Sequence, residues 1–151
     1  LWTRRLPPRV QVLGPVHIGR FPGSRPKTPT GYVVDLCSEL PGSANGEQNW
    51  VSLPMLDLVT PLAGTLSSAA AQIENATHKT DGKQETVLVC CALGFSRSAA
   101  AVATWLAGFN HVRDVEAAVD LLRAKRPEVV LRDTDLAAII QAVDALRGAR
   151  K

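Results

Sequence analysis

The chain has 151 residues, of which 46% are hydrophobic and 21% charged, and it carries a formal net charge of +3. This length and composition fit one globular domain with a sizeable core and exclude disordered and fibrous proteins. The positive charge is too small and too scattered for a nucleic-acid-binding surface, which excludes that class of partner, although a weakly basic surface suits anionic substrates.

The sequence also bears on the cellular compartment. No apolar run approaches the length of about 18 residues that spans a bilayer, and no signal-peptide pattern opens the chain. Because the first residue is Leu1 rather than Met, we expect a fragment of a longer protein. A membrane domain upstream of it is one alternative. The spacing of Cys37, Cys90 and Cys91 does not form a disulfide scaffold, which indicates a reducing compartment. We therefore expect a cytoplasmic domain, at the cytoplasmic face of a membrane if that upstream domain exists.

Strands dominate the first part of the chain. Residues 10–18 alternate around Gly14-Pro15, which predicts a short hairpin. A loop rich in proline and glycine leads to an apolar, β-branched run at residues 33–37 that predicts a buried strand. After a second loop, residues 50–56 alternate more loosely and predict a further strand.

A helix and a central strand are predicted next. The polar stretch at residues 75–85 predicts a surface connection after the helix, and the β-branched run at 86–91 predicts a central strand of a parallel sheet. The helix is predicted from apolar positions that recur at helical spacing, which are Leu62, Leu66, Ala69, Ala70 and Ile73.

Three helices are predicted to close the chain. Residues 98–109 have the composition of a buried helix, and Asp114 is expected to cap a second helix that stops at Pro127. Asp133 or Thr134 is expected to cap the last one. The alternation of strands and helices predicts a single small α/β domain, with a mostly parallel twisted sheet and helices on both faces. The apolar face of the last helix comprises Leu136, Ile139, Ile140, Val143 and Leu146.

The stretch that carries chemistry is the turn after the strand at residues 86–91. Cys91 and Arg97 stand there with five residues between them. A turn of this length between a buried strand and a helix N-terminus points backbone N–H groups into one concavity, and the helix dipole adds a positive field. The pattern therefore predicts an anion-binding cradle, formed in order by Cys91, Ala92, Leu93, Gly94, Phe95, Ser96, Arg97 and Ser98.

The residue types in this turn suit phosphate chemistry. Gly94 supplies a permissive backbone, and Arg97 offers a planar fork that pairs with two phosphate oxygens at once, which lysine cannot do. A thiolate is the nucleophilic form of cysteine and is stabilised by a positive field. Cys91 is therefore the predicted nucleophile.

The turn is similar to the Cys-x5-Arg-Ser loop of the protein tyrosine phosphatase superfamily, and residues 94–98 most resemble its small dual-specificity branch. The resemblance implies hydrolysis of phosphate monoesters through a phospho-cysteine intermediate on Cys91, without a metal or other cofactor. It implies that Arg97 stabilises the transition state and that Ser98 assists departure from the phospho-cysteine. It also assigns phosphate binding to Ala92, Leu93, Gly94, Phe95, Ser96 and Arg97.

The family also needs an aspartic acid on a separate upstream loop, which protonates the leaving oxygen and then activates water. Asp57 lies 34 residues before Cys91, directly after a predicted strand, and is expected to be this acid. An ordinary loop or helix-capping carboxylate is the alternative. Two further family-like features, Val-Asp-Leu-Cys at residues 34–37 and Arg-Pro at 126–127, extend the resemblance to roughly residues 12–147.

Cys90 departs from the family, which usually has histidine immediately before the nucleophile. A cysteine cannot make the hydrogen bonds by which that histidine holds the loop. Cys37 is expected to end its strand at the same edge of the sheet as Cys91. This suggests a reversible disulfide of Cys91 with Cys37 or Cys90, with core packing as the alternative role of Cys37. Asp35, inside the same strand, is expected to be a structural hydrogen-bonding partner.

The walls around the loop decide the substrate. Inositide phosphatases of this superfamily tend to place lysines inside the loop, and residues 92–96 contain none. This favours phosphotyrosine or phosphoserine/threonine of proteins. The alternatives are a phospholipid or phosphoinositide monoester, or a phosphate-binding pseudo-phosphatase. Sulfur transfer of the rhodanese type also uses a loop cysteine, but it has less need of Asp57. The histidines lack partners at metal-ligand spacing, so no metal is expected.

Overall fold

The computed structural model describes residues 9–20, 31–37, 50–55, 59–80, 85–91 and 95–149. None of the helices described there is both long and apolar enough to cross a membrane. In chain order, the strands and helices of these ranges are β1 (Arg9–Leu13), β2 (Val16–Arg20), β3 (Tyr32–Cys37), β4 (Trp50–Met55), α1 (Ala63–Thr80), β5 (Val87–Cys91), α2 (Arg97–Gly108), α3 (Val115–Lys125) and α4 (Asp133–Ala149).

The strands form one sheet in the order β1-β2-β5-β3-β4. β1 and β2 are antiparallel and form the predicted hairpin, in whose turn Gly14 has a φ of +54°, a conformation that glycine adopts without steric cost. The other neighbouring strands are parallel, which confirms the mostly parallel α/β sheet. β5 is the central strand. Its last residue stands at the carboxyl edge of the sheet, where ligand sites of parallel sheets gather.

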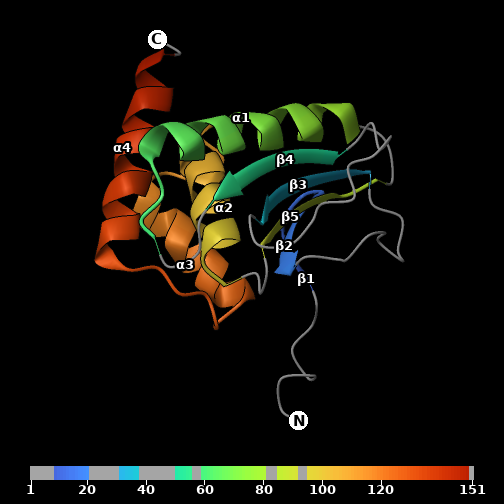
Figure 1. The fold of residues 1–151 in the computed structure, drawn as a ribbon, viewed down its shortest axis with the longest axis horizontal. Helices are drawn as coiled ribbons and strands as arrows, with labels where there is room; N and C mark the ends of the chain where they lie inside the picture. Colours follow the sequence, from blue (N-terminus) through green and yellow to red (C-terminus); the bar gives the residue numbers. More distant parts are fainter. Residues whose placement is uncertain are drawn as a thin grey trace.

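The two faces of the sheet are covered differently. Val34 and Leu36 of β3 and Val87 and Val89 of β5 pack with buried residues of all four helices in one hydrophobic core. Figure 1 shows these helices grouped on one side of the sheet. The helical layer expected on the other face is therefore not found among the described residues. That other face carries a small separate cluster, which comprises Val33, Trp50, Leu88 and Cys90.

Helix α1 is longer than the sequence pattern predicts. It continues to Thr80 instead of giving way to a connection at residue 75, because Ala76 and Thr80 are both buried. Leu62, an expected apolar position of this helix, instead precedes it and is 75% exposed. Ile139 and Ile140 are both expected on the apolar face of α4, but of the two only Ile139 is buried.

The N-termini of the last two helices are held by aspartates. Asp114 caps α3 as predicted, because its carboxylate accepts a hydrogen bond of 2.9 Å from a backbone N–H of the first turn. The cap of α4 differs from the expected Asp133 or Thr134. There the carboxylate of Asp135 accepts a hydrogen bond of 2.9 Å from the backbone N–H of Arg132, the residue before the helix. A side chain inside the first turn thus satisfies the N–H at the helix entry, as in a capping box.

A polar network joins helices α1 and α2 near the C-terminal end of α2. The carboxylate of Glu74 accepts hydrogen bonds of 2.9 Å each from the Trp105 indole N–H, from His111 and from His78. The Trp105 and His111 rings are also 4.5 Å apart between centroids. Burial raises the pKa of Glu74. The hydrogen bonds from these three side chains together lower it by more than burial raises it, so the pKa lies below its usual value.

We expect Glu74→Ala to lower the free energy of unfolding by about 1–3 kcal/mol, because Trp105 is buried and loses the acceptor of its indole N–H. The folded pKa of Glu74 is depressed, so its contribution is present above the unfolded pKa of about 4.3 and is lost as the pH falls through the folded value. Urea unfolding at neutral and acidic pH measures both effects. Asp144→Ala, an exposed carboxylate on α4, is the control. An equal loss in both variants would contradict this prediction.

Candidate active site

Cys91 is the last residue of β5, and Ser98 lies in the first turn of α2. Their Sγ and Oγ atoms are 3.4 Å apart and hydrogen-bonded, which brings the predicted nucleophile and the predicted assisting hydroxyl together. Both residues are buried, with Cys91 2% exposed, and both belong to the region where the central strand passes into the helix. Of the other predicted cradle residues, Ala92, Leu93 and Gly94 lie outside the described residues.

Arg97 is the first residue of α2 and is 5% exposed. Its Nη1 donates a hydrogen bond of 3.0 Å to the backbone carbonyl of Met55, at the end of β4. A guanidinium carries its N–H donors in a fixed fork, so a bond from one of them to a carbonyl orients the whole group. Met55 therefore orients the predicted phosphate clamp, a role that the sequence alone does not indicate.

The loop side of the site is supported by the segment after α3. The Arg126 guanidinium lies over the Phe95 ring, 5.0 Å from its centroid, and the Val130 backbone N–H donates a 2.7 Å hydrogen bond to the Phe95 carbonyl. Arg126 is 2% exposed. Its burial lowers the pKa of this guanidinium, while Glu128 and Cys91 raise it. An arginine is still charged at neutral pH, so Arg126 adds a positive charge near Cys91.

Cys90 points away from Cys91, because consecutive residues of a strand face opposite sides of the sheet. It packs in the small cluster with Val33 and Trp50, next to its register partner Asp35. Burial raises the pKa of the Cys90 thiol strongly, and the charges of Asp35, Cys91 and Cys37 raise it further. Cys90 is therefore protonated at neutral pH and does not act as a second nucleophile.

Asp35 has the structural role expected from the sequence. Its carboxylate accepts hydrogen bonds from the Cys37 backbone N–H at 2.9 Å and from the Trp50 indole N–H at 3.2 Å. It is fully buried, and these donors compensate the cost of removing a carboxylate from water. Asp35 thus ties β3 to β4 on the face that carries Cys90.

The predicted disulfide of Cys91 with Cys37 or Cys90 stays a proposal. All three cysteines are buried thiols in this structure. Because Cys90 and Cys91 face opposite sides of the sheet, a bond between them requires the end of β5 to rearrange. Peroxide treatment followed by mass spectrometry tests the proposal. Oxidation of Cys91 to sulfinic acid without any disulfide would reject it.

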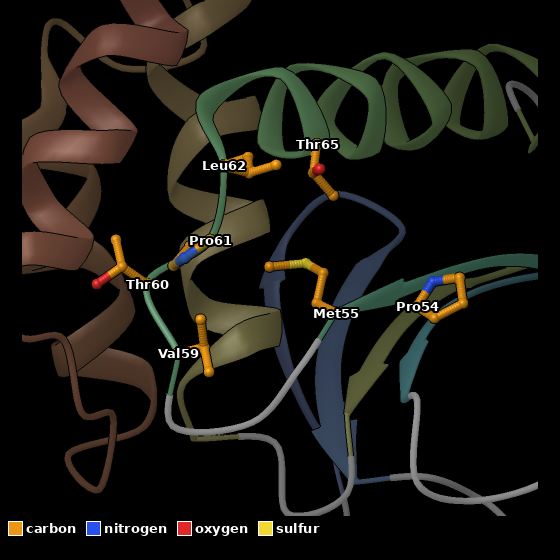
Figure 2. A pocket seen from close by; sticks show the side chains of 7 residues that line it. All are labelled: Pro54, Met55, Val59, Thr60, Pro61, Leu62 and Thr65. Carbon is orange, nitrogen blue, oxygen red and sulfur yellow. The ribbon is translucent and has the colours of Figure 1, made fainter.

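Asp57 lies outside the described residues, which end at Met55 and resume at Val59. Met55 precedes it and Val59 follows it, and both line an apolar pocket of about 360 Å³ between the end of β4 and the start of α1. Figure 2 shows the Met55 side chain pointing into this pocket and Leu62 and Thr65 along its α1 side. The remaining lining residues are Pro54, Thr60 and Pro61.

Comparisons with known proteins show the family and the fold. A family model described as dual specificity phosphatase, catalytic domain, matches residues 25–144. Among solved structures, Tk-PTP in its active form is 23% identical with a TM-score of 0.76, over 91% of this chain and 97% of that one. Human DUSP28 is 20% identical with a TM-score of 0.77, over 94% and 97%.

A third structure, PTPMT1 in complex with PI(5)P, is 17% identical with a TM-score of 0.78, over 96% of this chain and 100% of that one. A search of curated proteins finds no match to the sequence. The structural likenesses establish the fold, and the family model covers well over half of the chain. The chain therefore belongs to the dual specificity phosphatase catalytic-domain family of cysteine-dependent phosphatases.

Proposed function

We propose that Cys91, Arg97, Ser98 and Asp57 carry out phosphate monoester hydrolysis, most of all on phosphotyrosine or phosphoserine/threonine of proteins. The observation that supports this best is the hydrogen bond between Cys91, at the end of β5, and Ser98, which follows Arg97 in the first turn of α2. The bond from Arg97 to the Met55 carbonyl adds a link to the chain that leads into Asp57.

The reaction has two steps. The Cys91 thiolate attacks phosphorus, a P–S bond forms, and the P–O bond to the leaving group breaks while Asp57 supplies a proton to the departing oxygen. In the second step Asp57 takes a proton from water, which attacks phosphorus, and the P–S bond breaks. The Ser98 hydroxyl then stabilises the released thiolate. Arg97 and the loop N–H groups bind the phosphoryl oxygens throughout and stabilise the charge that develops on them.

A protein substrate is favoured because the loop offers no lysine for the additional phosphates of an inositide. Residues 92–96 contain only Ala, Leu, Gly, Phe and Ser. The apolar pocket at Met55 provides a surface for a side chain next to the phosphorylated residue. The solved PTPMT1 structure holds PI(5)P, which keeps a lipid monoester as the second candidate.

A substrate panel tests the proposal: phosphotyrosine and phosphothreonine peptides, and phosphatidylcholine vesicles that contain phosphatidic acid. We expect turnover of the peptides to exceed turnover of the vesicles. Turnover of the vesicles alone would reject the protein substrate. No turnover of any of these, or of para-nitrophenyl phosphate, would point to a pseudo-phosphatase.

We expect Asp57→Asn to lower kcat by about a hundredfold to ten-thousandfold on phosphothreonine peptides, whose alkoxide leaving group needs a proton. The loss on para-nitrophenyl phosphate should be much smaller, because nitrophenolate leaves without one. Steady-state kinetics on the two substrates measures the difference. An equal loss on both, or none on either, would remove Asp57 from the role of general acid.

A further inference from the structure

Arg20 stands beside the nucleophile although the two are far apart in the sequence. It is the last residue of β2, and the parallel pairing of β2 with β5 makes Arg20 the register partner of Cys91. Neighbouring strands are about 4.8 Å apart, and register partners face the same side of the sheet. Cys91 is buried, whereas Arg20 is exposed. Arg20 therefore presents a cation to solvent next to the site of phosphoryl transfer.

A second arginine makes this flank of the nucleophile cationic. The buried Arg126 lies close enough to both Arg20 and Cys91 for their charges to act on it. Arg126 is held over the Phe95 ring and buried, so it belongs to the support of the loop. Of the two guanidinium groups, Arg20 is the exposed one.

The opposite flank is apolar. Across the carboxyl edge of the sheet, β3 and β4 follow β5 on the side away from β2. Met55 at the end of β4 lines the apolar pocket, and its carbonyl holds Arg97. Val59 and Leu62, also in the lining, are 53% and 75% exposed. The predicted nucleophile thus lies between a cationic flank and an apolar flank.

We propose that Arg20 determines substrate specificity by binding a second anionic group, the carboxylate of an acidic residue that neighbours the phosphorylated residue of a peptide. An extended peptide advances about 3.3–3.6 Å per residue, so residues on either side of the phosphorylated one reach the two flanks. In a phospholipid, by contrast, the second anion and the acyl chains leave the monoester in the same direction. Opposite flanks therefore favour a peptide, and this inference rests on the protein-phosphatase function proposed above.

Matched peptides test the role of Arg20. Each pair carries phosphotyrosine with either glutamate or glutamine as its neighbour, first on the amino side and then on the carboxyl side. In the wild type we expect kcat/KM to be about threefold to tenfold higher for glutamate on one of these sides. Arg20→Gln should abolish this preference, and salt should weaken it because the contact is exposed. Arg20→Glu should prefer a third peptide of each set, which carries lysine at the same position. Arg113→Gln removes an equal charge from an exposed arginine in the connection between α2 and α3 and is the control.

The outcomes separate this proposal from the one on which it rests. If peptides are hydrolysed but Arg20→Gln leaves the glutamate preference intact, or the wild type shows none, the role of Arg20 is rejected while the protein-phosphatase function stands. If only phosphatidic acid vesicles are hydrolysed, the protein substrate is rejected and the role of Arg20 with it. An equal loss of preference in Arg113→Gln would show a general effect of net charge, which also overturns the proposal.

Discussion

Cys91→Ser is expected to lower the turnover of para-nitrophenyl phosphate by at least about a thousandfold. A serine hydroxyl is a much weaker nucleophile than a thiolate at neutral pH, because it stays protonated there. The replacement is nearly isosteric, so the fold should be retained. Initial-rate kinetics measures the loss, and thermal unfolding checks the fold.

Cys90→Ser is the matched control. Cys90 faces the other side of the sheet, in the cluster with Trp50, and its raised pKa keeps it protonated. Its replacement should leave most of the turnover, although a buried hydroxyl costs some stability. Loss of turnover in Cys90→Ser together with retention in Cys91→Ser would identify Cys90 as the nucleophile and overturn the proposed mechanism.

Arg97→Lys is expected to lower kcat/KM by about a hundredfold to a thousandfold. Lysine keeps the charge but lacks the planar fork, so it cannot hold two phosphoryl oxygens and the Met55 carbonyl at the same time. Binding of inorganic phosphate should weaken as well. Kinetics on para-nitrophenyl phosphate and competition by phosphate measure the two effects.

The same exchange at an exposed position provides the control for Arg97→Lys. Arg123 lies on α3, is exposed, and should tolerate lysine without a change in kinetics. Retention of turnover within about tenfold of the wild type in Arg97→Lys would show that charge alone suffices at this position. The geometric role of the guanidinium would then be wrong.

The sequence determines the local part of the site because that part is contiguous. The β-branched run that forms β5, the following turn and the start of α2 lie within residues 87–98, and their periodicity and composition suffice to predict a strand, a cradle and a helix. The hairpin of β1 and β2 and the cap at Asp114 are local in the same sense. The strand, the helix, the hairpin and the cap are confirmed, whereas the cradle stays a prediction.

Pairings between distant residues were decided only by the tertiary structure. The Met55 carbonyl that orients Arg97 is 42 residues away from it, and Glu74 meets Trp105 from 31 residues away. The length of α1 depends on the burial of Ala76 against the other helices, which no local pattern reveals. Such contacts follow from the packing of the helices and strands, which residue spacing alone does not predict.

The surroundings of Cys91 show this division most clearly. The sequence predicts that Cys91 and Arg97 form a phosphate-binding pair, because their spacing and flanking elements are a property of one short segment. It does not indicate that β2 pairs with β5, and so it gives no reason to connect Arg20 with Cys91. It also leaves open which cysteines share a face of the sheet, which the register of β3 and β5 decides. The chemistry of the loop is local, whereas the groups that surround a substrate come from strands that only the sheet brings together.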